Sequence, residues 1–285
     1  MLQSKSLHKN KLSVVILTYN EEKNLPYALE NVKDWADEVV ILDSYSTDKT
    51  IEIAESYRAK VHYRKFDNFS AQRKYALNEL PIKNDWIFVL DADEYLTDEL
   101  KDEISKLMKN EKDMKDAYFI KRRFYWQGQW LKRCFYPTTL LRFGKKGLID
   151  CDDRPINEHI ICKTENIGYL DNDFIDYNRK DLNDWVIKHN RYATSEAEQL
   201  MTKDKTKYNF FASQYERKRW IRTNIWNNLP PVFRPFIYFT FRYFIQGGFL
   251  DGKKAFMYHF IDSFVYRTLI DFKYLEKKWK KQEEK

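Results

Sequence analysis

The stretch that decides the fold is DWIFVLDADEYL, residues 85–96. Its first half is a short apolar run, which is typical of a strand buried on both faces of a parallel sheet. The run breaks at once into three carboxylates, Asp91, Asp93 and Glu94. In open α/β sheets the carboxyl end of a strand is the place where ligands bind. The stretch therefore predicts a strand together with a site at its end.

The pattern of a strand followed by a helix also occurs three times upstream. Strands are expected in KLSVVILTYN, DEVVILDSYS and KVHYRKF, and helical patterns follow in residues 21–36, 46–59 and 70–80. This alternation predicts an α/β fold with a Rossmann-like, mostly parallel sheet, flanking helices and right-handed crossovers. The segments TYN, DSYS and DAD then meet at one edge of the sheet.

The remainder of the chain changes character twice. Residues 97–111 predict a helix capped by Thr97 or Asp98, and the aromatic residues 117–161 predict a hairpin region that covers the site. From about residue 182 the pattern is helical. We expect an α/β domain over residues 11–181 and C-terminal amphipathic helices over residues 182–285.

Charge and cysteine content indicate the cellular setting. The 285 residues carry a net charge of +7, and residues 212–285 hold 15 basic and 7 acidic side chains. This basic quarter is suited to an anionic surface. The three cysteines have no metal-binding spacing, and the N-terminal residues show no apolar segment of a signal peptide. We expect a cytoplasmic protein.

Aromatic residues are concentrated in residues 232–274, which hold 15 Phe or Tyr with Arg and Lys interleaved. Paired helices broken at Gly247 and Gly248 and lying in a membrane interface fit this pattern, with rings at headgroup depth and cations at phosphates. A helical cap packed on the α/β domain fits it as well. The first interpretation predicts a peripheral protein on the inner face of the cytoplasmic membrane.

The spacing of Asp91 and Asp93 has a chemical meaning. In an extended segment, residues two apart point the same way, so the pair can share one cation, or one cation and one sugar hydroxyl. Mg²⁺ takes one or two protein carboxylates together with substrate phosphates. The pair therefore suits a metal-bound diphosphate, although an acidic strand-to-helix turn is also common as a solvated surface.

Polar residues at the other strand ends suit a nucleotide. Thr18, Tyr19, Asn20 and Glu21 follow the first strand, and Asp43 ends the second. A carboxylate at that depth can accept hydrogen bonds from a uracil ring or from ribose hydroxyls. Neither G-x-G-x-x-G nor a P-loop motif occurs, which disfavours NAD and P-loop ATP chemistry.

Four segments together resemble the nucleotide-sugar domain of the family 2 glycosyltransferases, which have the GT-A fold. They are SVVILTYNEEKNL, VVILDSYSTDKT, AQRKYAL and DWIFVLDADE, within residues 11–161. Further segments, RRFYWQGQW, LLRFGKKG, NEH and GGFLDGKKAF, resemble the branch that adds glucose or similar sugars to the lipopolysaccharide inner core. The resemblance implies an inverting, metal-dependent transfer from a nucleotide diphosphate sugar, a UDP-hexose, to a hydroxyl of a cell-surface glycan or lipid-linked acceptor.

The resemblance also implies roles for individual residues. Donor binding falls to Thr18, Tyr19, Asn20, Glu21, Asp43, Arg73, Asp91 and Asp93. A divalent ion, Mn²⁺ or Mg²⁺, is expected on Asp93 with Asp91. Glu158, in the place of the family's His-Glu pair, is expected to be the general base. This chain departs from the family at Asn157, where the family has His, and at Tyr45, where it usually has Gly.

Two other functions fit parts of the sequence. A nucleotidyltransferase also uses paired carboxylates and a metal on an α/β sheet, but LTYNEEKNL lacks its Gly-rich phosphate loop. A non-catalytic, basic nucleic-acid-binding module would use the C-terminal charge and aromatic rings. Under the glycosyltransferase interpretation no nucleic acid is expected, and the partners are a nucleotide-sugar donor, a glycan or glycolipid acceptor and an anionic membrane surface.

Overall fold

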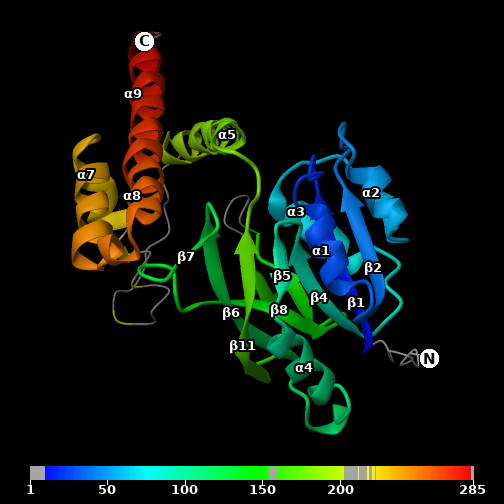
Figure 1. Ribbon diagram of the computed structural model, residues 1–285. Helices are drawn as coiled ribbons and strands as arrows, with labels where there is room; N and C mark the ends of the chain where they lie inside the picture. Colours follow the sequence, from blue (N-terminus) through cyan, green and yellow to red (C-terminus); the bar gives the residue numbers. More distant parts are fainter. Residues whose placement is uncertain are drawn as a thin grey trace. The chain divides into compact units, whose positions relative to one another are not determined.

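The computed structural model describes residues 10–153, 159–201, 211, 217, 220, 221 and 223–283 (Figure 1). The chain divides into two compact units, the first ending at Arg179 and the second beginning at Lys180. The predicted boundary lies two residues further on. Each unit is described by itself.

Strands of the first unit supply its framework. They are β1 (Asn10–Thr18), β2 (Ala36–Asp43), β3 (Lys60–Tyr63), β4 (Trp86–Asp91), β5 (Glu94–Leu96), β6 (Ala117–Trp126), β7 (Gln129–Leu131), β8 (Thr138–Lys145), β9 (Ile149–Cys151), β10 (Ile160–Cys162) and β11 (Ile167–Tyr177). The main sheet has the order β3-β2-β1-β4-β8-β6-β11-β5, with β7 paired to β6, while β9 and β10 form a separate ribbon. The strands β3, β2, β1 and β4 are parallel, as predicted, so their carboxyl ends share one edge.

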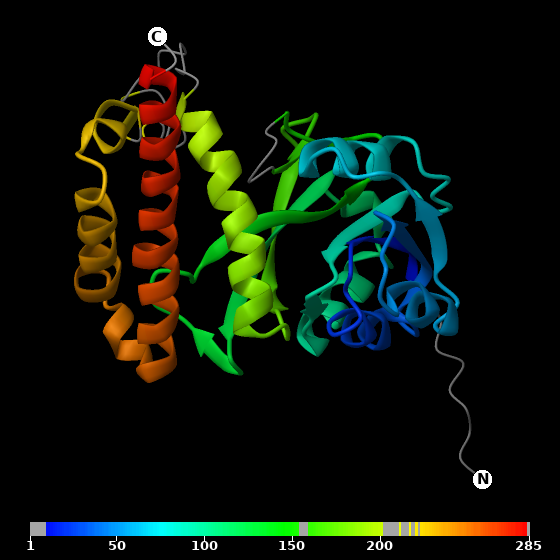
Figure 2. The ribbon, with the colours of Figure 1, turned by 90° about the horizontal axis from the view of Figure 1, so that it is seen from above.

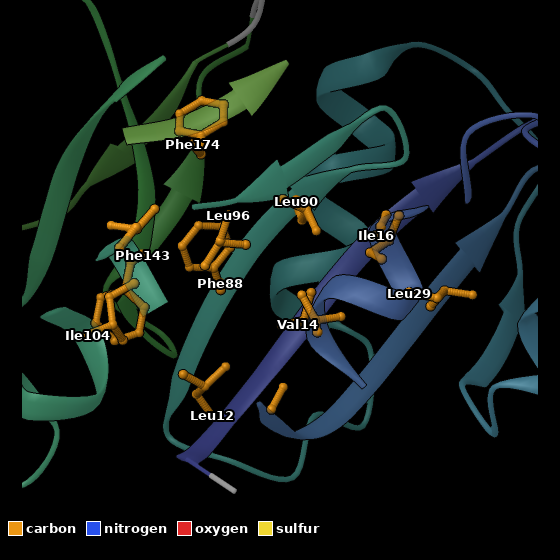
Figure 3. Packing of buried hydrophobic residues seen from close by; sticks show 14 of the residues in the cluster. Leu12, Val14, Ile16, Leu29, Phe88, Leu90, Leu96, Ile104, Phe143 and Phe174 are labelled. Carbon is orange, nitrogen blue, oxygen red and sulfur yellow. The ribbon is translucent and has the colours of Figure 1, made fainter. Parts of the chain in front are cut away.

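Side chains of β1 alternate between two cores, one on each face of the sheet. Leu12, Val14 and Ile16 join the core that packs against helices α1 (Leu25–Val32), α2 (Thr50–Ser56) and α4 (Asp98–Leu107), and Figure 3 shows their row along the strand. Val15 joins the other core, which α3 (Phe69–Asn78) and the β9-β10 ribbon cover. Both faces are therefore buried, and this explains the unbroken apolar run in the sequence.

The predicted helices of the first unit are confirmed. The helices α1, α2 and α4 fall within the expected segments, and α3 begins one residue before its segment, at Phe69. Thr97 is the N-cap of α4, and its hydroxyl accepts a hydrogen bond from the backbone N–H of Leu100 at 3.2 Å. A 3₁₀ turn, η1 (Glu111–Asp113), follows that helix.

The prediction that residues 117–161 form a hairpin region is confirmed by the antiparallel pairs β6-β7, β6-β8 and β9-β10, but most of these strands are not a separate cover. β6 and β7 do form a hairpin, but β6 and β8 are full members of the main sheet, with β8 antiparallel to both β4 and β6. The physical reason is continuity of the core, because Phe143 on β8 packs with Phe88 on β4 and is fully buried. The strand β11 was not expected at all, and it pairs parallel to β6.

The second unit is helical, as predicted. It contains α5 (Leu182–Met201), η2 (Trp226–Asn228), α7 (Phe233–Thr240), the π-helical turn η3 (Phe241–Ile245), η4 (Gly248–Asp251), α8 (Lys253–His259), the π-helical turn η5 (Phe260–Tyr266) and α9 (Arg267–Glu283). The helix η3 ends just before Gly247, which has φ 77° and allows the predicted break. Among these described residues, no helix is long and apolar enough to cross a membrane.

Two polar contacts inside the second unit involve the buried residues Tyr266, Arg234 and Asp271. The hydroxyl of Tyr266 donates to Glu196 of α5 at 2.7 Å, and Arg234 donates through Nε to Asp271 of α9 at 2.7 Å. The helices α5 and α9 lie side by side, drawn in yellow-green and red in Figure 2. Arg234, Trp226 and Asp271 help to line a small cavity of about 40 Å³.

Candidate functional site

The first part of the site consists of the two loops that follow β1 and β2. Asp43 is fully buried, and its Oδ2 accepts from Thr18 Oγ1 at 2.7 Å and from Ser46 Oγ at 2.6 Å. Its Oδ1 accepts from the backbone N–H of Ser46 at 2.7 Å. Asn20 continues the network, because its Oδ1 accepts from the backbone N–H of Thr47 at 2.8 Å. These bonds hold the two strand ends in one conformation.

This geometry places the predicted donor-binding residues at the ends of β1 and β2 in different settings. The carboxylate of Asp43, expected to meet a nucleobase or ribose, is occupied in shaping the loop. Tyr19, in contrast, is half exposed beside it. The backbone N–H of Glu21 donates to Thr50 Oγ1 at 2.7 Å, and its Oε2 accepts from Asn24 Nδ2 at 2.9 Å. Contact of these residues with a donor stays a prediction.

Asp91, at the end of β4, lies between two arginines. Arg73 of α3 donates through Nη2 to Oδ1 at 2.8 Å, and Arg142 of β8 donates through Nη2 to Oδ2 at 2.7 Å. Burial alone would raise the pKa of the Asp91 carboxyl, but the charges of Arg142 and Arg73 hold that pKa far below its usual range. Asp91 is therefore ionised at every physiological pH and orients both guanidinium groups.

Glu94 shares Arg142 with Asp91. Arg142 Nη2 donates to Glu94 Oε1 at 2.6 Å, and Glu94 Oε2 accepts from the backbone N–H of Asp91 at 2.9 Å. The Glu94 side chain is only 2% exposed. Burial raises the pKa of Glu94 well above its usual value against the attraction of Arg142, and the nearby carboxylates of Asp91 and Asp176 raise it further. The pKa values of Asp91 and Glu94, three residues apart, are thus shifted in opposite directions.

Asp176, near the end of β11, adds a fourth carboxylate. Burial raises the pKa of Asp176 to about 6, Arg122 opposes that rise, and the charges of Asp93 and Asp91 add to it. Arg122 donates through Nη1 to Asp176 Oδ2 at 3.1 Å. A carboxyl group with this pKa can hold or release a proton near neutral pH, which is the property a general acid or base needs.

Asp93, in the turn between β4 and β5, differs from Asp91 in having no arginine bound to it among the described contacts. Its Oδ2 accepts from Asn178 Nδ2 at 3.1 Å, and its backbone carbonyl accepts from the N–H of Tyr177 at 2.9 Å. The side chain is partly exposed. A carboxylate of this kind fits Mg²⁺ or Mn²⁺, since such ions use one or two protein carboxylates and complete their shell with phosphates and water.

The metal prediction named Asp93 and Asp91 as a pair. Asp91 is engaged by two arginines, so Asp93 is the member that fits an ion. Within the described part of the chain, no group of three or more His, Cys, Asp or Glu is placed to hold a metal.

The predicted general base, Glu158, lies outside the described residues. Its role stays a prediction.

Four residues of this cluster had no firm place in the sequence analysis. They are Glu94, Arg142, Asp176 and Asn178, and each makes a hydrogen bond within the cluster. Asp176 lies near the end of the unexpected strand β11, and Asn178 directly follows that strand. In the segment FIDYN polar residues follow two apolar ones, just as TYN and DAD follow the apolar residues of β1 and β4. That repeated ending was the available signal for β11.

Comparison with known proteins now gives the family. The model of glycosyl transferase family 2 matches residues 13–158, about half of the chain, including β1, β2 and β4 with their polar ends. The chain belongs to this family. The prediction of a family 2 glycosyltransferase is confirmed, and so is the α/β fold with flanking helices that the GT-A class requires.

Relatives of this glycosyltransferase cover different parts of it. An uncharacterized glycosyltransferase of Rickettsia felis is 30% identical over 254 residues, which are 85% of this chain and 84% of that protein. One of Rickettsia bellii is 41% identical over 128 residues, 45% of this chain and 43% of that protein. Among solved structures, residues 1–349 of S. aureus TarS in complex with UDP-GlcNAc are 16% identical with a TM-score of 0.44, covering 95% of this chain and 92% of that one.

Proposed function

We propose that this glycosyltransferase moves a hexose from a UDP-sugar to a hydroxyl of a cell-surface glycan or lipid-linked acceptor, such as the lipopolysaccharide core, with inversion at the anomeric carbon. The observation that carries the proposal is the ion-paired set of Asp91, Arg73 and Arg142 at the carboxyl end of β4, with the carboxylate of Asp93 two residues beyond Asp91. Acidic and basic groups at one sheet edge suit a diphosphate and its counter-ion.

The arginines have a clear electrostatic role in this reaction. The sugar leaves a diphosphate, on which negative charge grows as the bond to C1 breaks. Arg73 and Arg142 are both tied to Asp91 by short hydrogen bonds, so their orientation is set before the donor arrives. Groups fixed in this way stabilise developing charge without reorganising during the reaction.

The acceptor hydroxyl needs a base, because it is a weak nucleophile at neutral pH. Its oxygen attacks C1, its proton passes to Glu158, and the C1–O bond electrons leave with UDP. A Mn²⁺ or Mg²⁺ ion held by Asp93 would supply Lewis-acid stabilisation of the leaving diphosphate. One displacement without a covalent enzyme intermediate inverts the anomeric centre.

Calorimetry with UDP and GDP, with and without Mn²⁺, tests the donor proposal. Wild type is expected to bind UDP in a metal-dependent manner, and Asp93→Ala is expected to lose that dependence. Asp34→Ala, an exposed acid after α1, is the matched control and is expected to bind as wild type. Equal metal-dependent binding by Asp93→Ala contradicts the metal role, and no nucleotide binding by wild type contradicts the donor class.

A second variant separates binding from chemistry. Glu158→Gln keeps the size and shape of the side chain but cannot take up the acceptor's proton. It is expected to bind UDP as wild type does and to lose transfer from UDP-hexose. Retained transfer removes Glu158 from the mechanism.

We also propose that the second unit attaches the enzyme to the anionic inner face of the cytoplasmic membrane. Around the break between η3 and η4, the side chains of Phe244, Ile245 and Leu250 are more than half exposed. Exposed Lys253 and Lys254 follow at the start of α8. Apolar side chains next to cations match an interface in which acyl chains lie beneath anionic headgroups.

Vesicle flotation tests the membrane proposal. The full chain is expected to float with vesicles of anionic phospholipid and less with neutral ones. The double variant Ile245→Glu, Leu250→Glu is expected to stay in the soluble fraction while binding UDP normally. Tyr169→Glu places the same charge at an exposed aromatic position of the first unit and is the control. Flotation of the double variant with anionic vesicles at the wild-type level excludes this segment as the anchor.

A further inference from the structure

Two tyrosines beside the polar loop stack on each other without being buried. Tyr45 lies in the loop after β2, and Tyr63 ends β3. Their ring centroids are 5.7 Å apart with an interplanar angle of 26°. Their side chains are 59% and 49% exposed, so the pair presents a flat aromatic surface to solvent.

The backbone at Tyr45 makes this surface unexpected. Its φ is 62°, in the left-handed region that glycine enters freely and that a residue with a Cβ enters at a cost. Asn20 in the adjoining loop has φ 54°, but asparagine tolerates that conformation and its side chain is tied to Thr47. A tyrosine held in an unfavourable conformation and left exposed gains little for the fold. Such an outlier points to a functional role for the ring.

The position of the pair relates it to the rest of the site. In the sheet register Thr18 is opposite Asp43, and Asp43 is opposite Tyr63, so the three residues form a row across the ends of β1, β2 and β3. The strand β4 is two strands away from β2. Strands are about 4.8 Å apart, so roughly 10 Å separate the β2 loop from the strand that leads to Asp93. A ribose between base and phosphates can bridge such a span.

We infer that Tyr45, supported from behind by Tyr63, is a stacking platform for the nucleobase of the donor. This inference rests on the proposed function and adds to it the part of the site that holds the base. Stacking acts on the π face of the ring and does not read its edge, so the platform contributes affinity for nucleotides in general. Ligands without a base gain nothing from it.

The variant Tyr45→Gly tests the inference cleanly, because glycine removes the ring and suits the backbone. Its thermal unfolding is expected to match that of wild type. Its dissociation constant for UDP is expected to rise about ten-fold, the order of magnitude for loss of one base-aromatic stack. Binding of inorganic pyrophosphate with Mn²⁺ is expected to be unchanged.

Two further variants separate the ring from other causes. Tyr45→Phe keeps the ring and is expected to restore UDP affinity. Tyr169→Ala is the matched control, since Tyr169 is an exposed tyrosine stacked on Phe119 at 5.3 Å elsewhere in the same unit. It is expected to bind UDP as wild type.

The outcomes distinguish this inference from the proposed function. If wild type binds UDP and Tyr45→Gly binds it equally well, the platform is refuted and the donor class stands. Equal weakening of UDP and pyrophosphate in Tyr45→Gly also refutes the platform, because the effect then does not involve the base. If wild type binds no nucleotide at all, the proposed function and the platform are both overturned.

Discussion

Removal of Arg142 is the perturbation that most directly tests the charge arrangement of the site. The Arg142 side chain is 6% exposed and bridges two carboxylates, Asp91 at 2.7 Å and Glu94 at 2.6 Å. Arg142→Met keeps much of the aliphatic volume and removes the charge and both hydrogen bonds. Glu94 is then left buried without its cation, while Asp91 retains Arg73.

The expected loss of stability follows from this difference between Glu94, which loses its cation, and Asp91, which keeps one. Breaking a buried ion pair by removing one partner typically costs about 3–5 kcal/mol. The lower end applies here, because Asp91 keeps one arginine and its side chain is 29% exposed, and because Glu94 can take up a proton. A loss of about 3 kcal/mol in the free energy of unfolding is a large fraction of the stability of an ordinary domain.

The sign of the pH dependence is fixed by Glu94. Burial already raises the pKa of Glu94 in the folded protein against the attraction of Arg142, and removal of Arg142 raises it further. A carboxyl whose folded pKa lies above its unfolded value destabilises the fold as pH rises from the unfolded towards the folded pKa. The deficit of Arg142→Met is therefore expected to be larger at about pH 8 than at about pH 5.5.

Urea unfolding at these two pH values measures the effect. Adding Glu94→Gln to Arg142→Met is expected to recover about 1 kcal/mol or more at the higher pH, since glutamine still accepts from the N–H of Asp91 and carries no charge. Lys83→Met, which removes an exposed ion pair with Asp37, is expected to leave the stability close to that of wild type. A loss below about 1 kcal/mol for Arg142→Met, or a deficit that does not grow with pH, refutes the reasoning.

Three further substitutions test single contacts, each by urea unfolding. Thr18→Val removes a hydrogen bond to the buried carboxylate of Asp43 and is expected to cost about 2 kcal/mol, whereas no change shows that the loop does not depend on it. Thr97→Ala removes the cap of α4 and is expected to cost about 1 kcal/mol, with Thr97→Ser close to wild type. Gly144→Ala places a Cβ against Ile149 Cγ2 and is expected to cost about 1–3 kcal/mol, whereas unchanged stability shows that the β9-β10 ribbon moves aside at no cost.

The parallel half of the sheet could be predicted from sequence because its signal is local. Val14 and Val15 face opposite cores, so β1 is apolar without a break from Val14 to Leu17 and stands out between polar segments. The polar residues that follow each such strand necessarily meet at one edge. For the same reason the sequence predicts that these strand-end residues lie along one edge, and the parallel pairing of β1, β2, β3 and β4 brings them there.

The antiparallel half could not be predicted in the same way. Its strands combine apolar and charged positions, as in β6, whose residues are partly buried along much of its length. Whether such a segment covers a sheet or joins it depends on partners far away in sequence. The strand β8 joins the sheet because Phe143 packs on Phe88. The two residues are far apart in sequence, so no local pattern indicates their contact.

The roles of Asp91 and Asp93 show where motif spacing stops being informative. The spacing predicts that both side chains lie on one face, and nothing in it distinguishes them. The distinction comes from Arg142, which lies 51 residues further along the chain and binds Asp91 rather than Asp93. The same two-residue motif thus supplies a fixed anion that orients arginines and a less constrained carboxylate suited to an ion. The partners of each side chain, rather than the residue type, therefore determine what each of the two aspartates can bind.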